Sequence, residues 1–212
     1  MTEKKPLLVL SPHTDDGELA AGGTIARFSE ESWEVYYVAF SSRDKSLPPT
    51  APDDQLQREC LAATKLLGIP KANVIFLKNE TRSFPSQRQS ILDQMIELRD
   101  RFSPQLVLVP SAYDTHQDHR TVFEESLRAF KKSSSIWGFE HPWNNLSFTT
   151  DIFVALDENH VERKAEALAK YVSQKTRSYF KRDFILAWAR MRGTQVGIDH
   201  AEAFELVRMI VT

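Results

Sequence analysis

The most constraining feature of this sequence is a repeated pattern in which a short apolar run is followed by a stretch with helical spacing. The apolar runs are made largely of Val, Leu, Ile and aromatic residues, and they occupy residues 7–10, 35–40, 74–77, 106–109 and 152–156. Short continuous runs of this kind indicate buried strands. Because helical stretches separate them, the sequence predicts βαβ units and a mostly parallel sheet, which is an α/β fold.

The segments between the runs carry apolar residues at steps of three and four, which is typical of one helical face. This spacing predicts helices over residues 24–28, 56–67, 89–102, 121–132, 161–172 and 180–192, the last ended by Gly193. Polar residues and prolines predict loops over 41–53 and 79–87. Residues 136–145 have no clean period, and we interpret them as an irregular rim or edge.

Length and composition are those of one soluble globular domain. The chain has 212 residues with no internal repeat or linker, so we expect a single domain over residues 1–212. A net charge of −2 does not favour nucleic acid or a membrane as partner, and a homo-oligomer is left open. The single Cys60 excludes an internal disulfide and a Cys-x-x-Cys zinc site. No apolar stretch approaches the roughly 20 residues of a membrane span, so we expect a cytoplasmic protein.

Two clusters of metal-competent side chains follow predicted strands. Residues 11–18 (Ser-Pro-His-Thr-Asp-Asp-Gly-Glu) come after the first strand, and residues 110–120 (Pro-Ser-Ala-Tyr-Asp-Thr-His-Gln-Asp-His-Arg) come after the fourth. In open α/β sheets, ligands bind in the crevice at the carboxyl ends of the strands. The two clusters are therefore expected to form one site.

Together the clusters provide the groups of a metal-dependent hydrolase. Catalytic zinc typically takes three protein ligands, which His13, Asp16 and one histidine of the second cluster would supply. Asp15, adjacent to a ligand, could act as general base on a metal-bound water, and a protonated second histidine could stabilise an oxyanion. A metal would also lower the pKa of its water to around 7 and polarise a carbonyl. This inventory suits hydrolysis of an amide or an ester.

Simpler interpretations exist for each cluster taken alone. Asp15 or Asp16 could cap the helix that begins near Gly17, and His116 and His119 could be a surface pair at a helix start. The position of both clusters after strands of one sheet argues against both simpler interpretations. Three other histidines are interpreted as surface or packing residues: His141, His160 and His200.

The motifs resemble those of the PIG-L (LmbE-like) family of zinc-dependent N-deacetylases. Residues 11–18, with Gly-Gly-Thr-Ile at 22–25, resemble the first family motif, and His-Gln-Asp-His at 116–119 resembles the second. Weaker similarities are Arg58-Glu59 with Leu67-Gly68, Tyr-Val-Ser-Gln at 171–174 and Ala-Glu-Ala-Phe at 201–204. Thr14 and Gln117 depart from the family pattern, at positions that supply neither a ligand nor a base. The resemblance covers nearly the whole chain and implies a Rossmann-like three-layer α/β/α fold.

The resemblance also implies a ligand set and a base. His13, Asp16 and His119 would be the zinc ligands, and Asp15 would be the general base. The cofactor would be Zn²⁺.

Further roles are implied for three other residues. His116 would be the acid that stabilises the oxyanion, and the carboxylate of Asp118, behind His116, would orient its ring. Arg58 would contact the substrate.

The sequence therefore predicts a zinc-dependent hydrolase that removes the N-acetyl group from an N-acetylated amino sugar or sugar conjugate of the N-acetylglucosamine type. One alternative is a metallohydrolase, an amidase or esterase, for a non-sugar substrate. Another is a non-catalytic carbohydrate-binding module with a residual metal, although such a module would not need Asp15 and His116. Trp137 and Trp143 could stack on a sugar, but buried packing is favoured for each.

Overall fold

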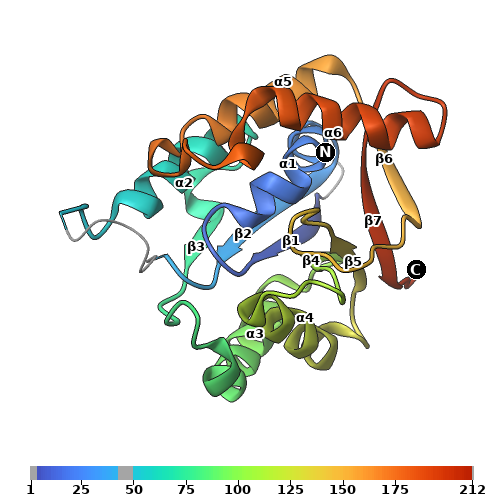
Figure 1. Ribbon diagram of the computed structural model, residues 1–212. Coiled ribbons are helices and arrows are strands. Elements are labelled where there is room, and N and C mark those ends of the chain that lie inside the picture. The colour runs from blue at the N-terminus through green and yellow to red at the C-terminus, as the bar shows by residue number, and fades with distance from the viewer. Residues whose placement is uncertain (1–3, 43–49, 212) are drawn as a thin grey trace.

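The protein is described by a computed structural model that covers residues 4–42 and 50–211 (Figure 1). Within these residues, seven strands form one sheet in the order β3-β2-β1-β4-β5-β7-β6. The strands from β3 to β5 are parallel, whereas β7 runs antiparallel to both β5 and β6. Their bounds are β1 (Lys5–Ser11), β2 (Trp33–Ala39), β3 (Val74–Phe76), β4 (Leu106–Pro110), β5 (Ser135–Phe139), β6 (Ile152–Leu156) and β7 (His200–Arg208).

Helices cover both faces of the sheet, which confirms the predicted three-layer α/β/α fold (Figure 1). One face carries α1 (Asp16–Glu30), α2 (Gln55–Leu66), α5 (Glu158–Leu168) and α6 (Arg182–Gln195). The other face carries α3 (Arg88–Phe102) and α4 (Gln117–Phe130). The described residues share this one sheet and form a single domain. No helix among them is long and apolar enough to cross a membrane.

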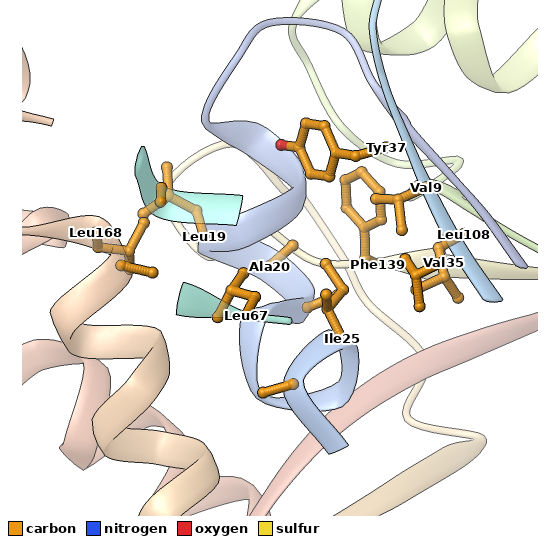
Figure 2. Close-up of a cluster of buried hydrophobic side chains, with 14 of the residues drawn as sticks. Val9, Leu19, Ala20, Ile25, Val35, Tyr37, Leu67, Leu108, Phe139 and Leu168 are labelled. Carbon is orange, nitrogen blue, oxygen red and sulfur yellow. The ribbon is translucent and has the colours of Figure 1, made fainter. Parts of the chain in front are cut away.

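Alternating side chains of the central strands divide the core into two layers. In β1, Leu7 and Val9 pack on the α1 side, while Leu8 and Leu10 pack on the α3 side, and all four are fully buried. A strand buried on both faces reads as a continuous apolar run, which is why the sequence pattern located β1. Figure 2 shows the α1 side, where Ile25 lies among the side chains from β1, β2 and β4.

Helix α1 is broken in the middle and is held together from the last strand. Ala21 has non-helical backbone angles (φ −129°, ψ 18°), so the amides that follow need a new acceptor. Glu202 of β7 supplies it, because its carboxylate accepts from the backbone N–H groups of Gly23 (2.9 Å) and Thr24 (2.6 Å). The buried Nζ of Lys164 lies 2.6 Å from the same carboxylate and balances its charge. The half of α1 that follows the break is thereby fixed against the sheet.

The structure differs from the sequence predictions in four places. Residues 136–139, predicted as an irregular edge, belong to β5, which lies inside the sheet between β4 and β7. Strand β7 was not predicted, and α6 continues through the buried Gly193 instead of ending there. The helix predicted over 161–172 ends at Leu168. The predicted loop 41–53 lies partly outside the described residues.

Candidate active site

The candidate site lies where the strand order reverses. Strand β1 pairs with β2 on one side and with β4 on the other, so the chain segments that leave β1 and β4 diverge from neighbouring strand ends. This switch point is the usual ligand site of doubly wound α/β folds. The two predicted clusters occupy these two segments and face one pocket, which is lined by His13, Asp15, Asp16, His116 and His119 among others.

Three side chains from the two segments converge on one point. Nδ1 of His13 lies 3.0 Å and Nε2 of His119 lies 3.2 Å from the same oxygen, Oδ2 of Asp16. The backbone N–H of His13 also donates to this oxygen at 2.8 Å. Burial opposes the ionisation of Asp16, but the charges of His119 and His13 hold its pKa well below the usual range. Asp16 is therefore an anion between two imidazoles.

A buried carboxylate holds the far nitrogen of each imidazole. Nε2 of His13 lies 3.0 Å from Oδ2 of Asp118, and Nδ1 of His119 lies 2.7 Å from Oδ2 of Asp114. Burial alone would lower the pKa of both imidazoles, but the nearby carboxylates, with Asp16 foremost, raise it to about 9 for His13 and about 10 for His119. These contacts fix the orientation of both rings.

The expected contact of the Asp118 carboxylate with His116 is replaced by contacts with other groups. Its oxygens accept from the backbone N–H groups of Arg82 (2.6 Å) and Phe84 (3.2 Å) and are paired with His13. Those three donors occupy the carboxylate. His116 is instead held by the backbone N–H of Asp118, which donates to its Nδ1 at 3.2 Å.

His116 stands at the cap position of α4 and lines the pocket. Burial, followed by the charges of His119 and His13, lowers its pKa to about 4. The imidazole is therefore neutral at pH 7, and because Nδ1 accepts a hydrogen bond, Nε2 carries the hydrogen. The structure thus supplies a neutral N–H donor where the sequence suggested a protonated histidine.

Asp15 also lines the pocket, next to the candidate ligand Asp16. Burial and the charge of Asp16 raise its pKa, while His13 and Arg177 lower it, with a result of about 6. Its side chain makes no capping hydrogen bond to α1, so the simpler interpretation as a helix cap is wrong. A carboxylate with this pKa is ionised at neutral pH and accepts a proton more readily than an ordinary aspartate.

The structure places Arg58 outside the pocket. Its guanidinium pairs with Asp54 at 2.7 Å on the exposed face of α2, and both side chains are 60% exposed. Leu56, which is buried and stands two positions earlier, lines the pocket instead. Two positions along a helix turn a side chain by about 200° at 3.6 residues per turn, so both residues cannot face the site. Among the described residues, the arginines that line the pocket are Arg82 and Arg177.

Two site residues were missed by the sequence reasoning or assigned elsewhere. Asp114 belongs to the second cluster, residues 110–120, but no role was predicted for it. His141 was interpreted as a surface or packing residue. Both are buried, and His141 follows the unpredicted strand β5. Asp114 had a usable signal, since it precedes His116 by two residues in a segment that leaves a strand. His141 had none, because its segment was read as irregular.

Aromatic side chains form one wall of the pocket. Trp143 and Tyr179 both line it, and their rings are stacked with centroids 4.0 Å apart and planes 10° apart. Trp137 instead is half-buried and packs against Phe28 and Phe204 at the margin of the core. Gln174, from the segment predicted to match a family motif, also lines the pocket.

The donor set suits a divalent cation. The ligand atoms of His13, Asp16 and His119 all lie within 4.8 Å of one another. Two imidazole nitrogens and one carboxylate oxygen are a common protein ligand set for catalytic zinc. The carboxylates behind both imidazoles complete the usual support of a metal-binding histidine. The residues present therefore fit a metal ion.

Comparison with known proteins gives the family. The family model described as PIG-L, GlcNAc-PI de-N-acetylase, matches residues 8–130. The Escherichia coli (strain K12) protein named uncharacterized deacetylase YaiS is 25% identical over 174 residues, which are 81% of this chain and 92% of that protein.

Solved structures share the fold. GalB, the 4-carboxy-2-hydroxymuconate hydratase from Pseudomonas putida KT2440, superposes with a TM-score of 0.80 over 98% of both chains at 23% identity. N,N'-diacetylchitobiose deacetylase from Pyrococcus horikoshii superposes with a TM-score of 0.73 over 96% of this chain and 84% of its own, at 20% identity. Because a hydratase and a deacetylase share this fold, the fold alone does not set the chemistry.

The family match and the deacetylase relative define the class, which is a hydrolase that removes acyl groups from amides. The chain belongs to the PIG-L family, GlcNAc-PI de-N-acetylase. The family resemblance stated from the motifs is thereby confirmed.

Proposed function

We propose that this protein is a zinc-dependent N-deacetylase that releases acetate from an N-acetylated amino sugar or a small conjugate of one. The observation that carries the proposal is the convergence of His13, Asp16 and His119 ligand atoms within 4.8 Å, beside the pocket-lining Asp15. Zinc held by those three residues would supply Lewis-acid activation of water and of the amide carbonyl. In this proposal the enzyme acts in the cell interior, and the molecule it binds is a small sugar conjugate.

In the proposed reaction, Asp15 is the general base. Its pKa of about 6 leaves it ionised at neutral pH and able to take the proton of the attacking water. As the C–N bond breaks, the proton on Asp15 becomes available for the leaving nitrogen. The products are acetate and a free amine: water supplies the added oxygen of acetate and one hydrogen of the amine, and its second hydrogen leaves as the proton that the acetic acid gives up.

His116 serves the oxyanion in this scheme. Its Nδ1 accepts from the backbone of Asp118, which leaves the Nε2 hydrogen for donation to the carbonyl oxygen as that oxygen becomes negative. A donor of this kind strengthens in the transition state and contributes little to ground-state binding. Asp118 is assigned to the support of His13, in accord with the 3.0 Å contact between them.

The choice of a sugar rests on two supports. The family description names a GlcNAc substrate, and the pocket wall carries the stacked Trp143 and Tyr179, which offer an aromatic surface of the kind that sugar rings pack against. A non-sugar amide or ester remains the alternative substrate. A binding module without catalysis is disfavoured, because Asp15 and His116 beside the ligand set serve no purpose in binding alone.

The test is a panel of N-acetylated sugars, sugar conjugates and non-sugar amides and esters, assayed for released acetate with and without a chelator. We expect acetate from the sugar members, loss of activity with the chelator, and recovery on addition of Zn²⁺. Metal analysis of His13→Ala and His119→Ala should show loss of stoichiometric zinc. Activity that survives the chelator, or full zinc in either variant, would contradict the proposal.

A further inference from the structure

Behind the candidate ligand His119, the carboxylate of Asp114 that contacts its ring forms a buried pair with His141, a residue to which no role has been assigned. Asp114 is 2% exposed and His141 is fully buried. Oδ2 of Asp114 lies 2.7 Å from Nδ1 of His119 and 3.3 Å from Nδ1 of His141. One carboxylate oxygen therefore faces both imidazoles.

The pair closes a ring of contacts with the ligand residues. Nε2 of His141 faces the backbone oxygen of Asp16 at 3.1 Å, and Oδ2 of Asp16 faces Nε2 of His119 at 3.2 Å. The ring therefore runs from His119 through Asp114 and His141 to Asp16 and back to His119. Its members come from three segments, which follow β1, β4 and β5.

The segments after β4 and β5 are also joined by their backbones. Asp114 and Asn145 form an isolated antiparallel bridge, and the N–H of Thr115 donates to the backbone oxygen of Asn144 at 3.1 Å. The side chain of Asn145 in turn accepts from the N–H of His141 at 2.7 Å. The position of His141 is thus fixed relative to Asp114 independently of the imidazole contact.

The ring bears on the two ligand residues in different ways. The carboxylate of Asp114 occupies Nδ1 of His119, which leaves Nε2 directed at Asp16 as the coordinating atom. His141 donates to the Asp16 backbone, at the point where α1 begins, and holds that residue at a set distance from His119. Metal affinity depends on such outer contacts because they orient the ligands before the ion arrives.

We propose that Asp114 and His141 are positioning residues that set the geometry of the His119 and Asp16 ligand atoms and thereby the metal affinity of the site. This inference rests on the proposed function, which assigns those two residues as ligands. Asp114 and His141 touch neither the reacting atoms nor the substrate in this scheme. Their effect is transmitted through His119 and the backbone of Asp16.

The test compares two variants that keep the general shape of each side chain. Asp114→Asn keeps the shape of the side chain but removes its charge, and His141→Phe keeps a ring against Phe139 and Trp143, with which His141 is in contact. Zn²⁺ affinity is measured by competition with a chromogenic chelator, and ligand geometry by the visible absorption of the Co²⁺-substituted protein. We expect zinc affinity to fall about 10- to 100-fold for Asp114→Asn, and to fall for His141→Phe, with an altered Co²⁺ spectrum.

A matched control comes from a buried histidine elsewhere in the chain. His160 is 7% exposed, lies 3.1 Å from a carboxylate oxygen of Glu30 and forms a capping box with Asp157 at the start of α5; it does not line the pocket. His160→Gln should lower thermal stability while leaving zinc affinity and the Co²⁺ spectrum unchanged. A merely structural role for Asp114 and His141 would give the same pattern as this control.

The combined variant tests whether the pair acts as one unit. If it does, the double variant should lose less zinc affinity than the product of the two single losses, because the second change removes a contact already broken. If His141→Phe does not fold, His141→Gln, which keeps a donor for the Asp16 carbonyl, replaces it and should retain more affinity than Asp114→Asn.

The outcomes separate this inference from the proposed function. Wild-type protein that binds one zinc, with binding lost in His119→Ala, keeps the ligand assignment whatever the pair does. Unchanged zinc affinity and Co²⁺ spectrum in folded Asp114→Asn and His141→Phe would then overturn the inference alone. Wild-type protein that binds no zinc would overturn the proposed function, and the inference with it.

Discussion

Zinc uptake by this site should be strongly coupled to proton release. Burial alone would lower the pKa of His13 and His119, but the carboxylates around them raise it to about 9 and about 10. Both imidazoles therefore carry a positive charge at pH 7 in the metal-free protein. Each must give up a proton to coordinate a cation, whereas Asp16 is already ionised because its pKa lies well below the usual range.

The pKa values set the size of the effect. The value pH 7 lies about two units below the pKa of His13 and about three units below that of His119. Competition from these two protons therefore weakens zinc binding by about five powers of ten, or about 7 kcal/mol at 1.36 kcal/mol per unit. The sign follows from competition: a rise in pH removes the competing protons and strengthens binding. With two protons displaced, apparent affinity should rise about 100-fold between pH 7 and pH 8.

Calorimetric titration in buffers with different ionisation enthalpies measures the number of protons released per zinc. We expect about two at pH 7, and a chelator competition series corrected for chelator protonation should give the matching slope. His13→Ala provides the control, because any residual binding should release about one proton fewer. A zinc affinity that does not change with pH, or the absence of proton release, would refute the argument that the carboxylates keep these imidazoles charged.

Four further predictions test other parts of the site. Asp15→Asn should retain zinc but lose about 10²-fold or more in kcat, and an active variant with full zinc would show that another group is the base. His116→Ala should lower kcat strongly with KM and zinc content nearly unchanged; loss of zinc by metal analysis would instead mark it as a ligand. Burial raises the pKa of Glu18 from 4.5 to about 8, so its contribution to stability is complete below pH 4.5 and is lost as the pH rises to about 8. The free energy of unfolding of Glu18→Gln, measured with urea, should therefore rise relative to that of wild type by several kcal/mol across that range, at 1.36 kcal/mol per pH unit. A difference that stays constant with pH would contradict the assigned pKa. Arg58→Ala should leave kcat/KM unchanged, because the guanidinium pairs with Asp54 on an exposed helix face; a marked rise in KM would restore the predicted substrate contact.

The fold was predictable where local pattern and burial agree. Strand β1 is buried on both faces, so its apolar run identified it without knowledge of its neighbours. Strand β7 begins His-Ala-Glu-Ala-Phe, with alanine and glutamate that have little strand preference, and it forms by pairing with β5 and β6. Strand β5 contains Gly138 and gave no clear period. Pairing over long sequence distances determined these two strands, and a single sequence does not display it.

The candidate site was predictable to the extent that its groups follow strands. His13, Asp16 and His119 could be placed near one another because β1 and β4 were both recognised and strand ends of a parallel sheet share one edge. Which atom each residue turns to which neighbour was not accessible. The carboxylate of Asp118 lies against His13 instead of His116 because backbone donors from the segment after β3 fix it, and those donors leave no mark in the sequence.

The contact between Glu202 and the broken helix α1 determines how this protein can be shortened for study. A fragment ending at Phe130 would hold the entire segment matched by the family model and every proposed zinc ligand. It would lack the Glu202 carboxylate that accepts from the N–H groups of Gly23 and Thr24, and with it the contact that holds the second half of α1 to the sheet. It would also turn β4 from a central strand into an exposed apolar edge, a template for aggregation. We therefore expect that the family segment does not fold as an independent unit, and that a recombinant protein for study should extend through β7.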